Sequence, residues 1–220
     1  MVTDGIFSML GEYQKIGEMR HIIDHYDKKY ELGVLLIIDD SHGVGAFGKT
    51  GRGVEEVENA TGDILVGTFG KSYGADGGYA VGDQVLIDYL REAAATYIFS
   101  NSISPGTAGA AKQAVELIDK KDGKKLLAKL GKNIKYFKQK AVKFGFQFAA
   151  DSIHPIQPLL IGDPVKTKMV VDRLYKCKIL VTNISFPVVP KGRDEIRIQL
   201  SASHRPEDID YLLSSLKSIL

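Results

Sequence analysis

Two apolar stretches of the sequence are each followed by side chains that could do chemistry. Val34–Ile38 is a continuous apolar run, typical of a parallel strand buried on both faces, and Asp39 and His42 come directly after it. Lys71 comes shortly after a second apolar run, Ile64–Gly67. Because open α/β sheets bind ligands at the carboxyl ends of their strands, we expect an acid, an imidazole and an amine near one sheet edge.

Each of these residues also has a purely structural interpretation. Asp39 and His42 could cap a neighbouring helix, and Lys71 could be a solvated loop lysine. Asp39 and Asp40 do not suit a catalytic carboxylate pair, because adjacent strand residues point to opposite faces. No metal-ligand spacing is present. The neighbours of Lys71 are small or carry hydroxyl groups, which leaves room for a bulky carbonyl compound: they are Gly67, Thr68, Gly70, Ser72 and Gly74.

Taken together, these groups are those that a pyridoxal phosphate pocket needs. An aspartate pairs with the pyridinium nitrogen, a lysine forms the Schiff base, and hydroxyl and glycine N–H donors bind the phosphate. Gly43–Thr50 also matches two phosphate-loop patterns, G-x-G-x-x-G and G-x-x-x-x-G-K-T. Such loops open a helix directly, and the following Gly51–Gly53 discourages one. A nucleotide-binding module therefore remains an alternative that ATP or NAD binding would test.

Composition excludes several other classes of protein. The 220 residues are 44% hydrophobic and 25% charged, as in ordinary globular proteins, and the net charge of +2 lacks the basic footprint of a nucleic-acid binder. The lysine-rich run over 120–143 is interpreted as a solvated helix face, because apolar residues recur within it at helical spacing. No membrane span or secretory signal is expected. The single Cys177 favours a reducing, cytoplasmic setting.

The order of the expected elements predicts an α/β region followed by a small α+β region. We expect a partial large domain over residues 1–110 and a small domain over residues 111–220. Only about three strands are expected in the first region, where sheets have roughly 4–6, so the chain is expected to begin within a domain. Strands are expected over 34–38, 64–67, 77–82, 156–161, 181–184 and 196–200, and helices over 12–30, 83–95, 106–145 (broken around 122–123), 164–177 and 206–220.

At this point the motifs resemble those of a known family, the α-oxoamine synthases, which are type I pyridoxal-phosphate-dependent acyltransferases. The resemblance implies the carboxyl part of a type I large domain, with a mostly parallel sheet, plus a small α+β domain. Within the family, three segments look most like the glycine C-acetyltransferases, also called 2-amino-3-ketobutyrate CoA ligases: Asp4–Met9, Phe99–Ser102 and Phe186–Gly192. The shared motifs of the family as a whole are Asp39–Gly45, Gly51–Gly53, Gly67–Lys71, Gly77–Tyr79, Phe99–Ser102 and Arg197–His204.

The resemblance also implies a role for each matched residue near the cofactor. Asp39 would pair with the pyridinium nitrogen and keep it protonated, and His42 would hydrogen-bond the 3-oxygen of the ring. Thr68 would bind the phosphate. Lys71 would hold the cofactor covalently and later remove the α-proton of the substrate.

Further roles concern the substrate and a second subunit. Ser100 and Asn101 would reach the phosphate of the neighbouring subunit's cofactor in a homodimer, and Arg197 would bind the substrate carboxylate. The implied reaction condenses glycine with acetyl-CoA to give 2-amino-3-oxobutyrate and CoA. Family members are about twice as long, so an amino-terminal half that completes the pocket is expected to be missing. The alternatives to this activity are that of another α-oxoamine synthase and that of a non-catalytic fragment.

Overall fold

The computed structural model describes residues 1–220, which form two compact units. The first comprises Met1–Phe7 and Tyr13–Lys125, and the second comprises Ser8–Glu12 and Leu126–Leu220. The division into residues 1–110 and 111–220 stays a prediction.

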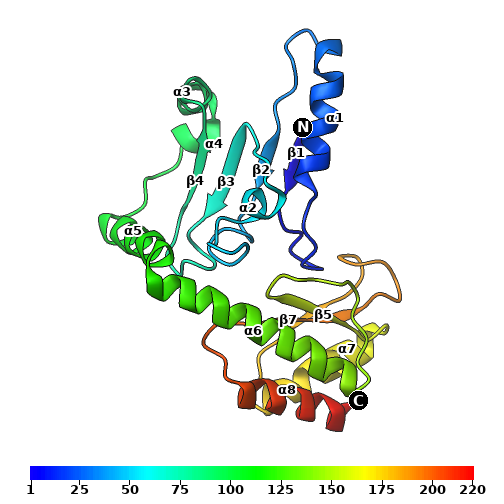
Figure 1. Cartoon of the computed structure of the whole chain (residues 1–220). Helices are drawn as coiled ribbons and strands as arrows, with labels where there is room; N and C mark the ends of the chain where they lie inside the picture. The colour runs from blue at the N-terminus through cyan, green and yellow to red at the C-terminus, as the bar shows by residue number, and fades with distance from the viewer. The chain divides into compact units, whose positions relative to one another are not determined.

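The first unit is built on a four-stranded sheet in the order β1-β2-β3-β4 (Figure 1). The first three strands run parallel, and β4 runs antiparallel to β3. The predicted α/β class with a mostly parallel sheet is therefore confirmed. The strands are β1 (Val2–Asp4), β2 (Ile37–Asp39), β3 (Ile64–Thr68) and β4 (Gly78–Gly82).

Helices α1 and α2 and strand β2 share one apolar core. Ile16 and Ile23 of α1 pack with Ile38 of β2 and with Val54, the first residue of α2, and all four are buried. Ile16 and Ile23 are seven positions apart, so they lie on the same side of α1. The helical elements of this unit are α1 (Ile16–Tyr26), the 3-10 turn η1 (Asp27–Lys29), α2 (Val54–Glu58), α3 (Gln84–Ala93), α4 (Ala95–Ile98) and α5 (Pro105–Asp119).

The predicted strand over 34–38 is wrong at its amino end, because side chains take its backbone donors. The N–H of Val34 donates to Asp27 Oδ1 at 2.7 Å, and that of Leu36 donates to Asp63 Oδ2 at 2.6 Å. Strand pairing therefore begins only at Ile37, and it extends to Asp39.

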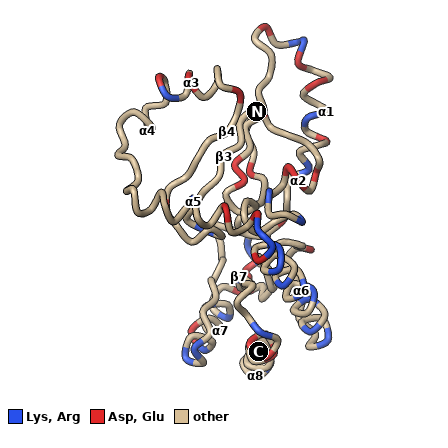
Figure 2. Tube along the Cα trace, turned by 60° about the vertical axis from the view of Figure 1, so that its left-hand side comes forward, with Lys and Arg blue, Asp and Glu red and all other residues tan.

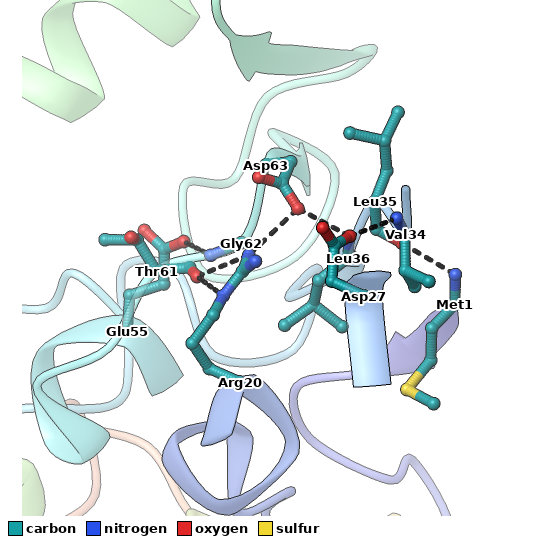
Figure 3. Close-up of polar contacts among 10 residues, drawn as sticks. All are labelled: Met1, Arg20, Asp27, Val34, Leu35, Leu36, Glu55, Thr61, Gly62 and Asp63. Carbon is teal, nitrogen blue, oxygen red and sulfur yellow. Dashed lines mark hydrogen bonds and ion pairs between the residues drawn. The ribbon is translucent and has the colours of Figure 1, made fainter. Parts of the chain in front are cut away.

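A polar network lies at the amino ends of β2 and β3 (Figure 3). Arg20 of α1 forms an ion pair with Asp63 at 2.9 Å and also donates to the carbonyl of Thr61. Burial opposes ionisation of Asp63, but the N–H of Leu36 and the Arg20 guanidinium outweigh it and lower the pKa of this carboxyl. The network joins α1 to the sheet at the edge opposite the predicted site.

Other elements of the first unit differ in their bounds from the predictions or were not predicted. The helix expected over 12–30 begins only at Ile16 and gives way to η1 after Tyr26. The edge strand β1 and the short helix α2 were not predicted. The break between the two long helices falls at Lys120 rather than around 122–123. Gly123 lies inside α6 (Lys121–Lys143), where a Cβ would stand 2.3 Å from the carbonyl oxygen of Leu117.

The second unit has a three-stranded antiparallel sheet in the order β5-β7-β6, with α7 and α8 packed together (Figure 1). Its core includes Val170 and Leu174 of α7 with Leu213 and Leu216 of α8, all fully buried. The predicted small α+β arrangement is confirmed. The elements are β5 (Ile156–Leu160), α7 (Pro164–Lys176), β6 (Thr182–Ile184), β7 (Glu195–Gln199) and α8 (Pro206–Ile219).

Helix α6 carries the lysine-rich run, and Figure 2 shows its basic residues along the helix. Leu130, Phe137 and Ala141 are buried, and their spacing places them on one side of the helix. Lys129, Lys132 and the other lysines of this helix are exposed or half-buried. The predicted solvated lysine face is confirmed. None of the helices in this structure combines the length and the apolar character needed to cross a membrane.

Candidate functional site

Asp39 ends β2 at the carboxyl edge of the parallel sheet. It stands opposite Asp4 of β1 and Val66 of β3. Its Oδ1 accepts the N–H of Ser41 at 3.0 Å, which fixes the orientation of the carboxylate. His42 follows three positions later in the adjoining turn and is half-buried.

Thr68 ends the neighbouring strand β3, at the same edge of the sheet. Its hydroxyl donates to the carbonyl of Gly77 at 3.0 Å and accepts the N–H of Gly70 at 3.1 Å. Lys71 lies just beyond, in an exposed loop. Parallel strand pairing therefore brings Asp39 and Thr68, with the Lys71 loop, to one edge of the first unit.

Asp40, rather than Asp39 or His42, caps the neighbouring helix. Its Oδ2 accepts the N–H of Val54, the first residue of α2, at 2.7 Å, and the residue is fully buried. Three glycines surround this carboxylate. A Cβ at Gly5, Gly43 or Gly53 would stand 2.3, 2.2 or 1.8 Å from one of its oxygens. This cage was not predicted, although an aspartate after a buried strand with glycines at 43 and 53 is a visible signal in the sequence.

Arg197 lies in the middle of β7, in the second unit. Its side chain lies on the opposite side of the sheet from Ile196 and Ile198, which are buried. Nη1 donates to the carbonyl of Ser8 at 2.6 Å, and Nε is buried without a hydrogen-bond partner. Burial lowers the pKa of this guanidinium, and the nearby Glu195 carboxyl opposes that shift.

Ser100 and Asn101 follow α4 and are both exposed. Ser100 Oγ lies 3.5 Å from the carbonyl oxygen of Tyr97, and no hydrogen bond joins Ser100 or Asn101 to Asp39, Thr68 or Lys71. Their predicted contact with a second subunit stays a prediction.

The groups at the sheet edge fit pyridoxal phosphate. One oxygen of Asp39 is held by Ser41, and the other accepts no hydrogen bond from the chain and could pair with a protonated ring nitrogen. The Lys71 amine is exposed and makes no ion pair or hydrogen bond. Thr68 carries a hydroxyl at the point where the chain turns into the Lys71 loop, and its hydrogen would have to leave the Gly77 carbonyl to reach a phosphate. This donor set matches the three needs of the cofactor: a ring partner, an amine and a phosphate donor.

We expect the stability of the chain to fall as the pH rises from about 5 to 8. Burial raises the pKa of Asp40 from 3.8 to about 7, and burial likewise raises that of Glu195 from 4.5 to about 7. At a pH between its ordinary pKa and its raised pKa, each carboxyl keeps its proton in the folded chain after losing it in the unfolded chain. The free energy of unfolding therefore falls by about 2 kcal/mol for each group as the pH rises from about 5 to 8. Urea titrations at pH 5 and pH 8 would measure the difference. Asp40→Asn and Glu195→Gln should each reduce it, and a chain that is more stable at pH 8 would contradict the expectation.

Comparisons with known proteins show which proteins the chain resembles. The whole chain aligns with an 8-amino-7-oxononanoate synthase of Petrotoga mobilis at 38% identity and with a 2-amino-3-ketobutyrate coenzyme A ligase of Escherichia coli at 37% identity. In both cases the alignment covers 100% of this chain and 54% of the relative. The chain therefore spans about half the length of the curated relatives it matches.

Solved structures also match nearly the whole chain and about half of their own length. A serine palmitoyltransferase of Sphingomonas wittichii matches with a TM-score of 0.87 and 27% identity, over 99% of this chain and 53% of the other. A serine palmitoyltransferase variant of S. paucimobilis with a bound PLP–myriocin aldimine matches with a TM-score of 0.88 and 25% identity, over 99% of this chain and 54% of the other.

These matches confirm the resemblance to α-oxoamine synthases, together with the predicted fold class. The bound PLP of a matched structure confirms pyridoxal phosphate as a cofactor of this group of enzymes. Residues 1–216 match the family described as aminotransferase class I and II. The chain belongs to the aminotransferase class I and II family.

Proposed function

We propose that the protein is a pyridoxal-phosphate-dependent acyltransferase that condenses glycine with acetyl-CoA to 2-amino-3-oxobutyrate and CoA. The observation that carries this proposal is the convergence of Asp39, Thr68 and the Lys71 loop at the carboxyl edge of β2 and β3. The choice of glycine and acetyl-CoA is supported by the motifs and by the 37% identity to the E. coli 2-amino-3-ketobutyrate coenzyme A ligase.

The residues of this chain have separate tasks in that reaction. When bound, pyridoxal phosphate supplies an electron sink for a carbanion at the α-carbon of the amino acid. Asp39 keeps a proton on the ring nitrogen by pairing with it, His42 hydrogen-bonds the ring 3-oxygen, and Thr68 binds the phosphate. Lys71 Nζ would hold the cofactor, and as a free amine it would take the α-proton of glycine.

Arg197 binds the carboxylate of the amino acid. Its planar guanidinium offers two parallel N–H groups to a carboxylate, which a lysine cannot do. The overall reaction forms one C–C bond at the α-carbon of glycine and breaks the thioester C–S bond, so free CoA thiol is released. We also propose that the protein is cytoplasmic and works as a homodimer in which Ser100 and Asn101 face the partner's cofactor.

Incubation with pyridoxal phosphate, borohydride reduction and peptide mass spectrometry would test cofactor binding by the purified chain. An adduct concentrated on Lys71 supports the proposal, and labelling scattered over exposed lysines contradicts it. Release of CoA thiol from acetyl-CoA in the presence of glycine then tests the reaction.

A second candidate function is that of another α-oxoamine synthase. It is favoured by the 38% identity to the 8-amino-7-oxononanoate synthase of P. mobilis. A panel that combines glycine, alanine and serine with short and long acyl-CoA thioesters distinguishes the two. Faster CoA release with alanine or serine, or with a longer acyl group, would favour the second candidate.

Replacing Arg197 with alanine should weaken glycine binding by about 10- to 100-fold, because a charge-assisted hydrogen-bond pair is lost. The measurement is the glycine concentration that half-saturates the absorbance change of the cofactor-loaded chain. Arg197→Lys should recover only part of the affinity. Arg173→Ala is the matched control, since Arg173 is exposed on α7. Unchanged glycine binding in Arg197→Ala would remove Arg197 from the proposed site.

A further inference from the structure

The loop that carries Lys71 is closed by its own backbone. The N–H of Phe69 donates to the carbonyl of Gly77 at 2.9 Å, and that of Ala75 donates to the carbonyl of Phe69 at 2.9 Å. The N–H of Gly74 donates to the carbonyl of Lys71 at 3.1 Å. These bonds fix the shape of the loop, but none of them joins it to the segment that carries Asp39 and His42.

One side chain makes that connection. The hydroxyl of Ser72, the residue after Lys71, donates to the backbone carbonyl of Val44. Val44 is buried and lies two positions after His42. Its N–H donates to the carbonyl of Asp40 at 3.0 Å, so the turn that Ser72 reaches is itself anchored at the end of β2.

Gly45 makes room for this contact. Its φ of +79° lies in the left-handed region that favours glycine, and a Cβ there would stand 2.4 Å from Ser72 Oγ. Any larger residue would strain the turn and push Ser72 away from Val44. We call the hydrogen bond from the Ser72 hydroxyl to the Val44 carbonyl, with the space that Gly45 leaves for it, the Ser72 latch.

We propose that Ser72 is a positioning residue, which holds the Lys71 loop in place against the turn that carries Asp39 and His42. The inference rests on the proposed function of Lys71. Ser72 itself touches neither substrate nor cofactor in this proposal. Its hydroxyl limits the positions that the loop can take and so keeps the Lys71 amine on the same side as the Asp39 carboxylate.

The test compares three variants with the parent chain. Ser72→Ala removes the hydroxyl, Ser72→Thr keeps it, and Gly45→Ala obstructs the contact from the other side. Ser214→Ala, at an exposed serine of α8, is the matched control. The readout is the rate at which pyridoxal phosphate labels Lys71, trapped by borohydride and measured by peptide mass spectrometry between pH 6 and pH 9, relative to the labelling of the other lysines.

We expect Ser72→Ala and Gly45→Ala to slow specific labelling of Lys71 by about three- to tenfold, the range for loss of one hydrogen bond. Ser72→Thr and Ser214→Ala should behave like the parent chain, and Ser72→Ala should still unfold in one cooperative urea transition. Equal labelling of Lys71 in Ser72→Ala and the parent would overturn the latch and leave the proposed function intact.

A wrong proposed function would give a different experimental result. If the parent chain shows no preferred labelling of Lys71, amide hydrogen exchange at Gly74 and Ala75 still tests the latch. Exchange that is about three- to tenfold faster in Ser72→Ala than in the parent supports it. Exchange that is unchanged overturns it.

Discussion

Lys71→Ala is expected to abolish the specific pyridoxal phosphate adduct of the chain. Lys71 is the amine nearest along the chain to Thr68 at the carboxyl edge of β3, and it makes no other hydrogen bond or ion pair. Any turnover of glycine and acetyl-CoA should fall by about 10²- to 10⁴-fold, the contribution of a positioned base, with loss of the covalent anchor adding to it. Borohydride trapping with peptide mass spectrometry measures the first effect, and CoA thiol release measures the second.

Lys49→Ala is the matched control for this experiment. Lys49 is exposed in the glycine-rich loop of the same unit and lies outside the predicted site. It should label weakly in the parent chain, and its loss should leave the adduct on Lys71 unchanged. A Lys71→Ala chain that keeps a single dominant adduct would mean that another lysine carries the cofactor.

Gly53→Ala should lower the free energy of unfolding by about 3 kcal/mol or more. Two effects add at this position. The backbone at Gly53 has φ +78° and ψ −152°, a region essentially confined to glycine that costs another residue about 1–3 kcal/mol, and a Cβ would stand 1.8 Å from Asp40 Oδ2. That oxygen accepts the N–H of Val54, so displacing it breaks a buried hydrogen bond worth about 1–3 kcal/mol when one partner is left unsatisfied. Urea titration at constant pH measures the change.

Gly74→Ala measures the cost of backbone strain at a position where the added Cβ meets no other atom. Gly74 also has a positive φ, +63°, but nothing lies within 4 Å of the position that a Cβ would take. We expect a loss of about 1 kcal/mol there, from backbone strain alone. Equal losses in the two variants would show that the carboxylate of Asp40 moves aside without cost.

Apolar patterns were enough to predict most elements of the second unit. The strand expected over 156–161 ends one residue earlier, at Leu160. Helix α7 begins at Pro164, after an Asp163 side chain that accepts the N–H of Lys166 at 2.7 Å, and such caps are visible in a sequence. Strand β1 escaped prediction because only three residues pair and Val2 is exposed, so no apolar pattern marks it.

The candidate site also has parts that could be predicted from the sequence and parts that could not. Asp39 and Thr68 could be placed because each ends an apolar run, and the carboxyl ends of parallel strands share an edge. The bond from Ser72 to Val44 could not be predicted, because it depends on how two loops 28 residues apart approach each other. The cage around Asp40 is visible only in part, since Gly43 and Gly53 follow it closely in the sequence but Gly5 joins them only in the folded chain.

The segment Ser8–Glu12 has a consequence for any attempt to divide the protein. It belongs to the second unit, while the residues on both sides of it belong to the first. The carbonyl of Ser8 accepts from Arg197 Nη1, and that of Gly11 accepts from Ser152 Oγ at 2.9 Å. The chain therefore passes between the units three times, and a single cut after Lys125 leaves this five-residue insert attached to the wrong product. The second unit is discontinuous along the chain, and an independent module would need Ser8–Glu12 joined to 126–220 by a new connection.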